Sequence, residues 1–90
     1  MATDPLYRRS GDVLWRSTPT GLWLRPLGGE TLTVAAPGDA VWVLLEEPAT
    51  LDDLVRALAD HFGEQVERIR GDVETLLADL VARGVVRVDP

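Results

Sequence analysis

The sequence contains no cysteine, and this absence excludes a disulfide framework and a thiolate metal site. It contains a single histidine, His61, so no pair of histidines is available to bind a metal ion. No apolar run approaches the roughly twenty residues that a membrane-spanning helix needs, and Met1–Ser10 lacks the apolar stretch of a signal peptide. We therefore expect a cytoplasmic protein whose partner is neither a membrane nor a metal ion.

Positive charge is also scarce. The 90 residues carry nine Lys and Arg, all of them arginine, against fifteen Asp and Glu, which gives a net charge of −6. Nucleic-acid binding depends on clustered positive charge, so this balance argues against a nucleic-acid partner. The charge is also uneven, because residues 1–40 hold four arginines and four acids whereas residues 41–90 hold five arginines and eleven acids. Apolar residues make up 46%, which predicts a single globular domain over residues 1–90.

The first part of the chain has the composition of a β-sheet. Alternating residues predict strands at Val13–Ser17, Gly21–Arg25 and Thr31–Val34. The turn residues Thr18–Gly21 and Pro26–Gly29 separate them, and connections this short join antiparallel neighbours. We therefore expect a three-stranded antiparallel meander.

The second part of the chain predicts three helices, because its apolar residues recur at helical spacing. Thr50 fits an N-cap, Asp53 fits the third position of a capping box, and Gly63 fits the residue that follows a helix. The expected fold class is α+β, a winged helix-turn-helix in which a three-stranded antiparallel meander is followed by three helices. The helices are expected from about Ala36 to Glu47, from Leu51 to Phe62 and from Glu64 or Gln65 to Arg83, with Val85–Val88 as a short strand or an extended tail.

The expected third helix has an apolar arc of roughly 140°, which is wider than one packing seam needs. We expect one edge of this arc to face the core and the other edge to border a different surface. The edges are Ile69, Leu76 and Leu80 on one side, and Val66, Leu77 and Val81 on the other.

No set of residues forms a catalytic constellation, so we expect a protein that is not an enzyme and holds no cofactor. Gly28-Gly29 lacks the third glycine and the following helix of a phosphate-binding loop. The acidic pairs Asp52-Asp53 and Asp72 with Glu74 fit a capped helix start and a solvated helix face better than paired catalytic carboxylates.

The strand Thr31–Val34 is the strongest candidate for a binding element. It is short and β-prone, and it lacks the charges and prolines that protect an exposed sheet edge. An extended peptide could add to it as a further strand, beside the apolar arc of the third helix. Two alternatives stay open: a winged-helix DNA-binding regulator, which the neutral-to-acidic third helix disfavours, and an ancillary structural subunit that holds an enzyme and binds no peptide.

The ordered set of these features resembles the PqqD-like proteins, the recognition elements for precursors of ribosomally synthesized and post-translationally modified peptides (RiPPs). The resemblance covers nearly the whole chain, and it depends on the order of the motifs because no single motif is specific. The residues that carry it are Pro5, Arg8-Arg9, Leu22, Leu24, Thr31–Val34, Gly38–Ala40, Trp42–Leu45, Thr50–Leu54, Leu58, Phe62, Val73, Leu77, Leu80 and Gly84–Val86.

The resemblance implies a non-catalytic domain that captures the leader region of a precursor peptide as an additional strand and delivers it to a modifying enzyme. The tryptophan-rich strands, the Thr50 helix start and the free-standing length resemble the members found in lasso-peptide pathways, where the partner is a leader peptidase. Members in PQQ synthesis work instead with a radical SAM enzyme. Arg70 could pair with an acidic leader side chain or with Glu74, four residues on. The residues implied for peptide binding are Glu30, Thr31, Leu32, Thr33 and Val34 for backbone pairing, and Val66, Arg70, Val73, Glu74 and Leu77 for the helix wall.

Overall fold

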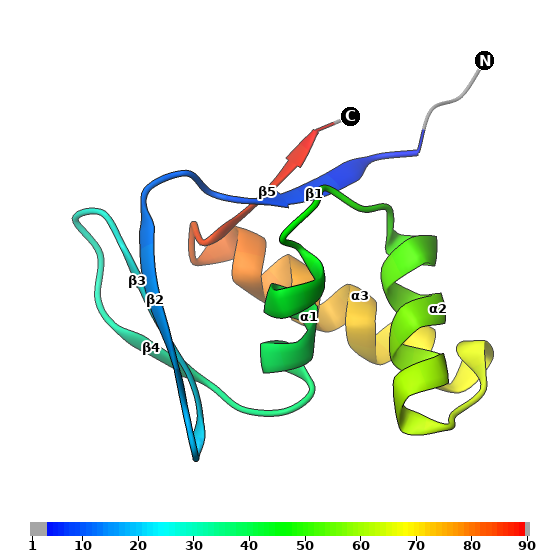
Figure 1. Cartoon of the computed structure of the whole chain (residues 1–90). Helices are drawn as coiled ribbons and strands as arrows, with labels where there is room; N and C mark the ends of the chain where they lie inside the picture. Colours follow the sequence, from blue (N-terminus) through cyan, green and yellow to red (C-terminus); the bar gives the residue numbers. More distant parts are fainter. Residues whose placement is uncertain (1–3, 90) are drawn as a thin grey trace.

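The computed structural model describes residues 4–89, which form five strands and three helices (Figure 1). Residues 1–3 and 90 of the predicted domain lie outside the described range. The strands are β1 (Leu6–Arg9), β2 (Val13–Thr18), β3 (Gly21–Pro26), β4 (Leu32–Val34) and β5 (Val86–Asp89). The helices are α1 (Gly38–Leu44), α2 (Leu51–Phe62) and α3 (Val66–Ala82).

The strands form two antiparallel sheets, β2-β3-β4 and β1-β5. The first is the predicted meander, in which Trp23 of β3 lies opposite both Arg16 of β2 and Thr33 of β4. The second joins the two ends of the described chain, with Leu6 opposite Asp89. The prediction of an α+β fold with antiparallel strands and three helices is thus confirmed.

The sequence analysis predicts no strand before Val13, and this is wrong because Leu6–Arg9 forms β1. The pairing partner of β1 lies at the opposite end of the chain, so no local pattern reveals it. On its other side β1 bonds to the segment after α1, from Tyr7 N to Ala49 O at 2.8 Å, and a bond from Ser10 N to Val85 O at 3.0 Å continues its pairing with β5. Of the two alternatives for the C-terminal segment, the structure selects the strand.

The helix α1 ends at Leu44, earlier than the predicted end near Glu47. Its last turn is tightened, because Leu45 N donates to Trp42 O at 3.2 Å and Glu46 N donates to Val43 O at 3.1 Å. The Arg9 guanidinium of β1 donates to the same Trp42 carbonyl at 2.7 and 3.0 Å. Arg9 thus gives this carbonyl group at the end of α1 the hydrogen-bond donor that a further helical turn would otherwise supply.

The boundaries of α2 agree with the prediction, because they depend on local residues. Thr50 Oγ1 accepts a hydrogen bond from Asp53 N at 3.1 Å, and Asp53 Oδ2 accepts one from Thr50 N at 3.3 Å. This reciprocal pair is a capping box. Gly63 ends α2 with φ +67°, and Gly84 follows α3 with φ +81°, a backbone region that favours glycine.

The core lies between the inner face of the β2–β4 sheet and the helices. Figure 1 shows the meander on one side of α1 and the helix α2 on the other. From β3, Leu22 and Leu24 are buried, and Trp42 of α1 is the largest buried side chain. The other buried apolar residues come mainly from the helices: Val41, Leu45, Leu54, Val55, Leu58, Ala59, Val73, Leu77, Leu80, Val85 and Val86.

Candidate functional site

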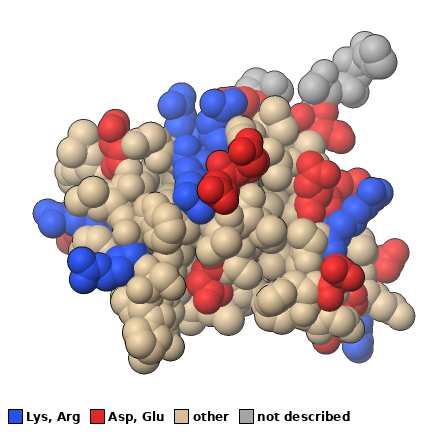
Figure 2. Space-filling model, in the orientation of Figure 1, with Lys and Arg blue, Asp and Glu red and all other residues tan. Residues whose placement is uncertain are grey.

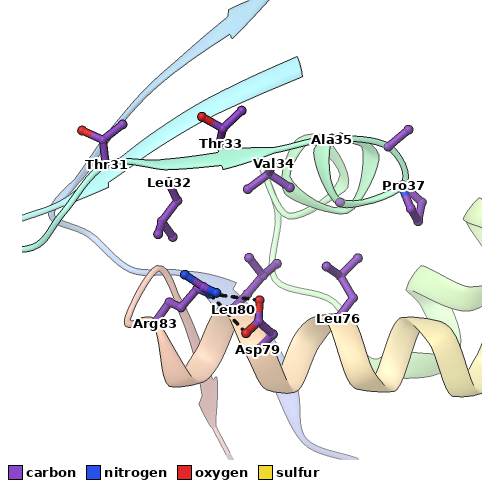
Figure 3. A pocket seen from close by; sticks show the side chains of 12 residues that line it. Thr31, Leu32, Thr33, Val34, Ala35, Pro37, Leu76, Asp79, Leu80 and Arg83 are labelled. Carbon is purple, nitrogen blue, oxygen red and sulfur yellow. Dashed lines mark hydrogen bonds and ion pairs between the residues drawn. The ribbon is translucent and has the colours of Figure 1, made fainter. Parts of the chain in front are cut away.

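The strand β4 lies at an edge of its sheet. Within residues 4–89 it pairs only with β3, so its other edge presents backbone N–H and C=O groups that no strand of this range takes up. Successive side chains of a strand point to opposite faces. Figure 3 shows Leu32 and Val34 turned toward α3, and Thr31 and Thr33 turned away from it.

A groove of about 480 Å³ lies between β4 and α3 (Figure 3). Leu76 and Leu80 project from α3 toward β4, and they face the half-buried side chains of Leu32 and Val34. The chain that leaves β4 closes one end of the groove with small side chains. The full lining is Thr31–Gly38, Leu76, Asp79, Leu80 and Arg83.

Gly38 sets the width of the closed end. It is buried at the start of α1, and a Cβ atom built there would overlap Cγ1 of Val34 and lie 3.4 Å from Cδ1 of Leu76. The absence of a side chain therefore allows α1, β4 and α3 to approach one another at this point.

Asp79 and Arg83 are the charged residues of the groove lining. Nε of Arg83 donates to both carboxylate oxygens of Asp79 at 3.1 Å, one helical turn away. Both side chains are about half exposed, so the pair is solvent-screened and open to exchange of partners with a bound molecule. The groove thus combines an apolar floor with one polar, charge-balanced wall.

The structure brings most of the predicted strand residues to this groove. Thr31, Leu32, Thr33 and Val34 all line it. Glu30 precedes this segment, is exposed and lies outside the lining. Four of the five predicted strand residues therefore line the groove as one continuous segment.

The structure places the predicted helix residues elsewhere. Val73 and Leu77 belong to the hydrophobic core, Val66 is half-buried and Glu74 is exposed. Arg70 bonds to Asp52 of α2, with Nη2 to Oδ1 at 2.8 Å, so the described structure shows this pairing in place of the contact with Glu74. None of these five residues lines the groove beside β4.

The groove wall comes instead from residues that the sequence analysis does not assign to the site: Leu76, Asp79, Leu80 and Arg83. Leu76, Leu80 and Arg83 follow helical spacing, and the first two lie on the Ile69 edge of the apolar arc. The two-edged arc therefore contains the signal for this wall, but the resemblance implies residues on the other edge.

A second, smaller hollow of about 390 Å³ continues past Ala36 and Pro37, which border both hollows. Phe62 and Ile69 contribute apolar surface to it, and Val73 lies at its floor. This hollow brings one predicted wall residue, Val73, to a surface that is continuous with the groove.

Between residues 4 and 89, no three His, Cys, Asp or Glu side chains are grouped so that they could hold a metal ion. No helix in the same range has the length and apolar character needed to cross a membrane. An unpaired strand edge beside an apolar groove is suited to binding an extended chain.

Three comparisons with known proteins bear on this site. A family model described as "Coenzyme PQQ synthesis protein D (PqqD)" matches residues 21–86. No curated protein gives a significant sequence match. Among solved structures, the chain is similar to the PqqD truncation of PqqCD from Methylobacterium extorquens, solved by solution NMR and described as a functional and stand-alone RiPP recognition element. That match has a TM-score of 0.76 and 19% sequence identity, and it covers 91% of this chain and 88% of the other.

Proposed function

Because this chain belongs to the PqqD family, we propose that it binds the leader region of a ribosomal precursor peptide as a strand along the open edge of β4. The observation that carries the proposal is the free edge of β4 beside the groove. Each backbone hydrogen bond to an added strand contributes about 1 kcal/mol, whatever the peptide's sequence. Side chains that enter the groove then supply the selectivity.

The groove favours a peptide with apolar anchor residues. Alternate side chains of an added strand would point toward Leu76 and Leu80, whereas the residues between them would point to the side of Thr33. A polar anchor would meet Asp79 and Arg83, which can release each other to pair with it. The site thus comprises Thr31–Val34, with Glu30 at its start, and this wall of α3.

The predicted helix wall has a smaller part in this proposal. It comprises Val66, Arg70, Val73, Glu74 and Leu77. A peptide that continues past Pro37 enters the second hollow and contacts Val73 there. Arg70 is bound to Asp52 and positions α2 against α3, so it acts on the fold rather than on the peptide.

The fold in this proposal is a winged helix-turn-helix that binds peptide rather than DNA. The helices α2 and α3, joined at Gly63, make the helix-turn-helix, and the meander is the wing. The exposed surface of α3 carries Glu67, Asp72 and Glu74 beside Arg68, and such a neutral-to-acidic surface disfavours contact with a phosphate backbone.

In this proposal the bound precursor is delivered to a separate enzyme, since the similar solved structure is described as a stand-alone RiPP recognition element. A leader held at β4 keeps the remainder of the precursor free to enter a separate active site. We assign this enzyme to the RiPP-modifying class, with the leader peptidase of a lasso-peptide pathway as the specific candidate. The tryptophan-rich strands and the Thr50 helix start support that candidate.

Peptide titration tests the proposal. Fluorescently labelled leader peptides from the precursors encoded near this chain are expected to bind saturably, as measured by anisotropy. Ala35→Trp places a large ring in the groove at an exposed position, and it is expected to weaken binding about tenfold or more, which corresponds to about 1.4 kcal/mol.

Ala78→Trp is the matched control, since Ala78 is exposed on α3 and lies outside the groove lining. It is expected to leave the affinity within about twofold, well below the cost of a lost anchor. If none of the leader peptides bound saturably, or if both tryptophan variants lost affinity equally, the groove would not be the binding site.

A further inference from the structure

The β2–β4 sheet has a second face, opposite to the one that packs on the helices. Leu22 and Leu24 are buried in the core, so Trp23 between them points to this other face. Cross-strand partners lie on the same face, and the pairs here are Arg16 with Trp23, Leu14 with Arg25, and Trp23 with Thr33. We call this surface the outer sheet face and define it as Leu14, Arg16, Trp23, Arg25 and Thr33.

The outer sheet face is apolar at its centre and open. Leu14 is 66% exposed, and Trp23 beside it is half-buried. A hollow of about 590 Å³ borders this face along β2. Leu14, Arg16, Thr18 and Trp23 line it, together with Trp15, which lies opposite the buried Leu24 and so belongs to the inner face. Large apolar side chains grouped around an open hollow mark an interaction surface, whereas isolated ones do not.

The charge of this face differs from that of the whole molecule. The strands β2, β3 and β4 hold two arginines, Arg16 and Arg25, and no acidic residue, although the chain carries a net charge of −6. Asp12 and Glu30 lie outside the strands, in the turns that border the sheet. In Figure 2 the red side chains are most frequent over the helical side, while the side with the strands is mostly tan with patches of blue and little red.

We propose that the outer sheet face binds a second protein, whose contact surface has an apolar centre edged by Asp or Glu carboxylates. The two arginines match such an edge, and the hollow beside Leu14 and Trp23 accepts an apolar side chain. A second copy of this chain fits poorly, because a symmetric contact between two outer faces sets arginine against arginine. The occupant is therefore a different protein, namely the enzyme that receives the peptide.

The outer sheet face also differs between the protein with a bound peptide and the protein without one. This consequence rests on the proposed function. Arg16, Trp23 and Thr33 form one cross-strand row that ends at the open edge of β4. A strand added at that edge extends the row, because half of its side chains point to the outer face. The second protein thus contacts a surface completed by the leader, and it binds the loaded form more tightly than the empty form.

The experiment uses the modifying enzymes encoded near this chain, purified and titrated against the full-length protein with and without leader peptide. The double variant Arg16→Glu with Arg25→Glu is expected to weaken enzyme binding about tenfold or more, and Leu14→Asp to do the same. The control is Arg56→Glu with Arg68→Glu on the helical side, which changes the charge equally at side chains that are 74% and 75% exposed. The control is expected to stay within about twofold.

Leader affinity, measured on the same variants, separates this proposal from the proposed function. The outer-face variants are expected to keep leader affinity within about twofold, whereas Ala35→Trp loses the leader but keeps binding of the enzyme to the empty form. Three results would each overturn the outer-face proposal. The outer-face and control variants could lose enzyme affinity equally, or no enzyme could bind at all. The protein alone could also form a dimer that Arg16→Glu dissociates. Failure of every leader to bind, with enzyme binding still sensitive to Arg16 and Arg25, would overturn only the proposed function.

Discussion

Gly38 decides how closely three elements approach one another beside the groove. Any side chain there would overlap Val34 of β4 and press on Leu76 of α3. The backbone of Gly38 does not have a positive φ, so the requirement is one of space and not of conformation. Its role is therefore visible only where α1, β4 and α3 meet.

We expect Gly38→Ala to lower the free energy of unfolding by about 1–3 kcal/mol, the usual cost of overpacking, and to weaken leader binding because Val34 must move. Chemical denaturation and peptide titration measure the two effects. Gly71→Ala is the control, since a Cβ atom at Gly71 in α3 has no neighbour within 4 Å. It is expected to stabilise the protein by up to about 1 kcal/mol, and destabilisation of both variants alike would contradict this account.

At the scale of elements, Arg9 joins β1 to α1 and β2. Its guanidinium donates two hydrogen bonds to Trp42 O, and it lies 4.7 Å from the ring centroid of Trp42 and 5.1 Å from that of Trp15. Burial lowers the pKa of Arg9, and the carboxylate of Glu46 opposes that shift. The side chain stays protonated at neutral pH, because the pKa of arginine starts far above this range.

Removal of this link is expected to destabilise the whole fold. Arg9→Met should lower the free energy of unfolding by about 2 kcal/mol, since it leaves a helix-end carbonyl without its charged donor and removes a cation from two rings. Arg8→Met is the matched control, because Arg8 pairs with Asp89 at 2.7 Å but both side chains are more than 40% exposed. Its cost should stay below about 1 kcal/mol. Equal destabilisation by the two substitutions in urea unfolding would refute the assignment.

At the scale of the whole molecule, charge is separated between the two sides. The first forty residues are neutral, and they contain the β2–β4 sheet, whereas the acidic excess lies in residues 41–90 with α2 and α3. Many of these acids cap or solvate helices, as Asp53 does at the start of α2. Their summed field nevertheless extends about 10 Å into solvent at moderate ionic strength, which is far enough to act on a peptide approaching the groove.

A leader with basic residues around its apolar anchors is therefore expected to bind faster and more tightly than a matched leader with acidic residues. The difference should be largest at low salt and should shrink toward zero near 1 M salt, where the screening length falls to about 3 Å. Stopped-flow association and equilibrium titration of the two peptides measure it. If both bound equally well at low and high salt, net charge would have no part in recognition.

Prediction from the sequence succeeds where the decisive residues are neighbours along the chain. The capping box of Thr50 and Asp53, the glycine after each of α2 and α3, and the alternation of β2 and β3 all act within a few positions. It fails for β1, whose partner is at the far end of the chain, and for the end of α1, which Arg9 helps to fix from another element. Local signals thus predict local boundaries, and remote partners alter them.

For the candidate site, the same distinction separates the strand from the helix. The segment Thr31–Val34 was identifiable because its short, uncharged and β-prone character is a property of its own residues. The apolar arc of α3 was also identifiable, but which edge borders the groove depends on the rotation of α3 about its axis. That rotation follows from the burial of Val73 and Leu77 in the core, and it turns Leu76 and Leu80 toward β4.

The sequence by itself determined α2, α3 and the β2–β4 meander with its uncharged last strand, because the energies involved act between close neighbours. Only the tertiary structure decided the groove wall, the closed end at Gly38 and the outer sheet face. Each of these depends on side chains from separate elements, and a helix turns its surface by about 100° for each residue. One residue along α3 therefore separates Leu76, in the groove, from Leu77, in the core.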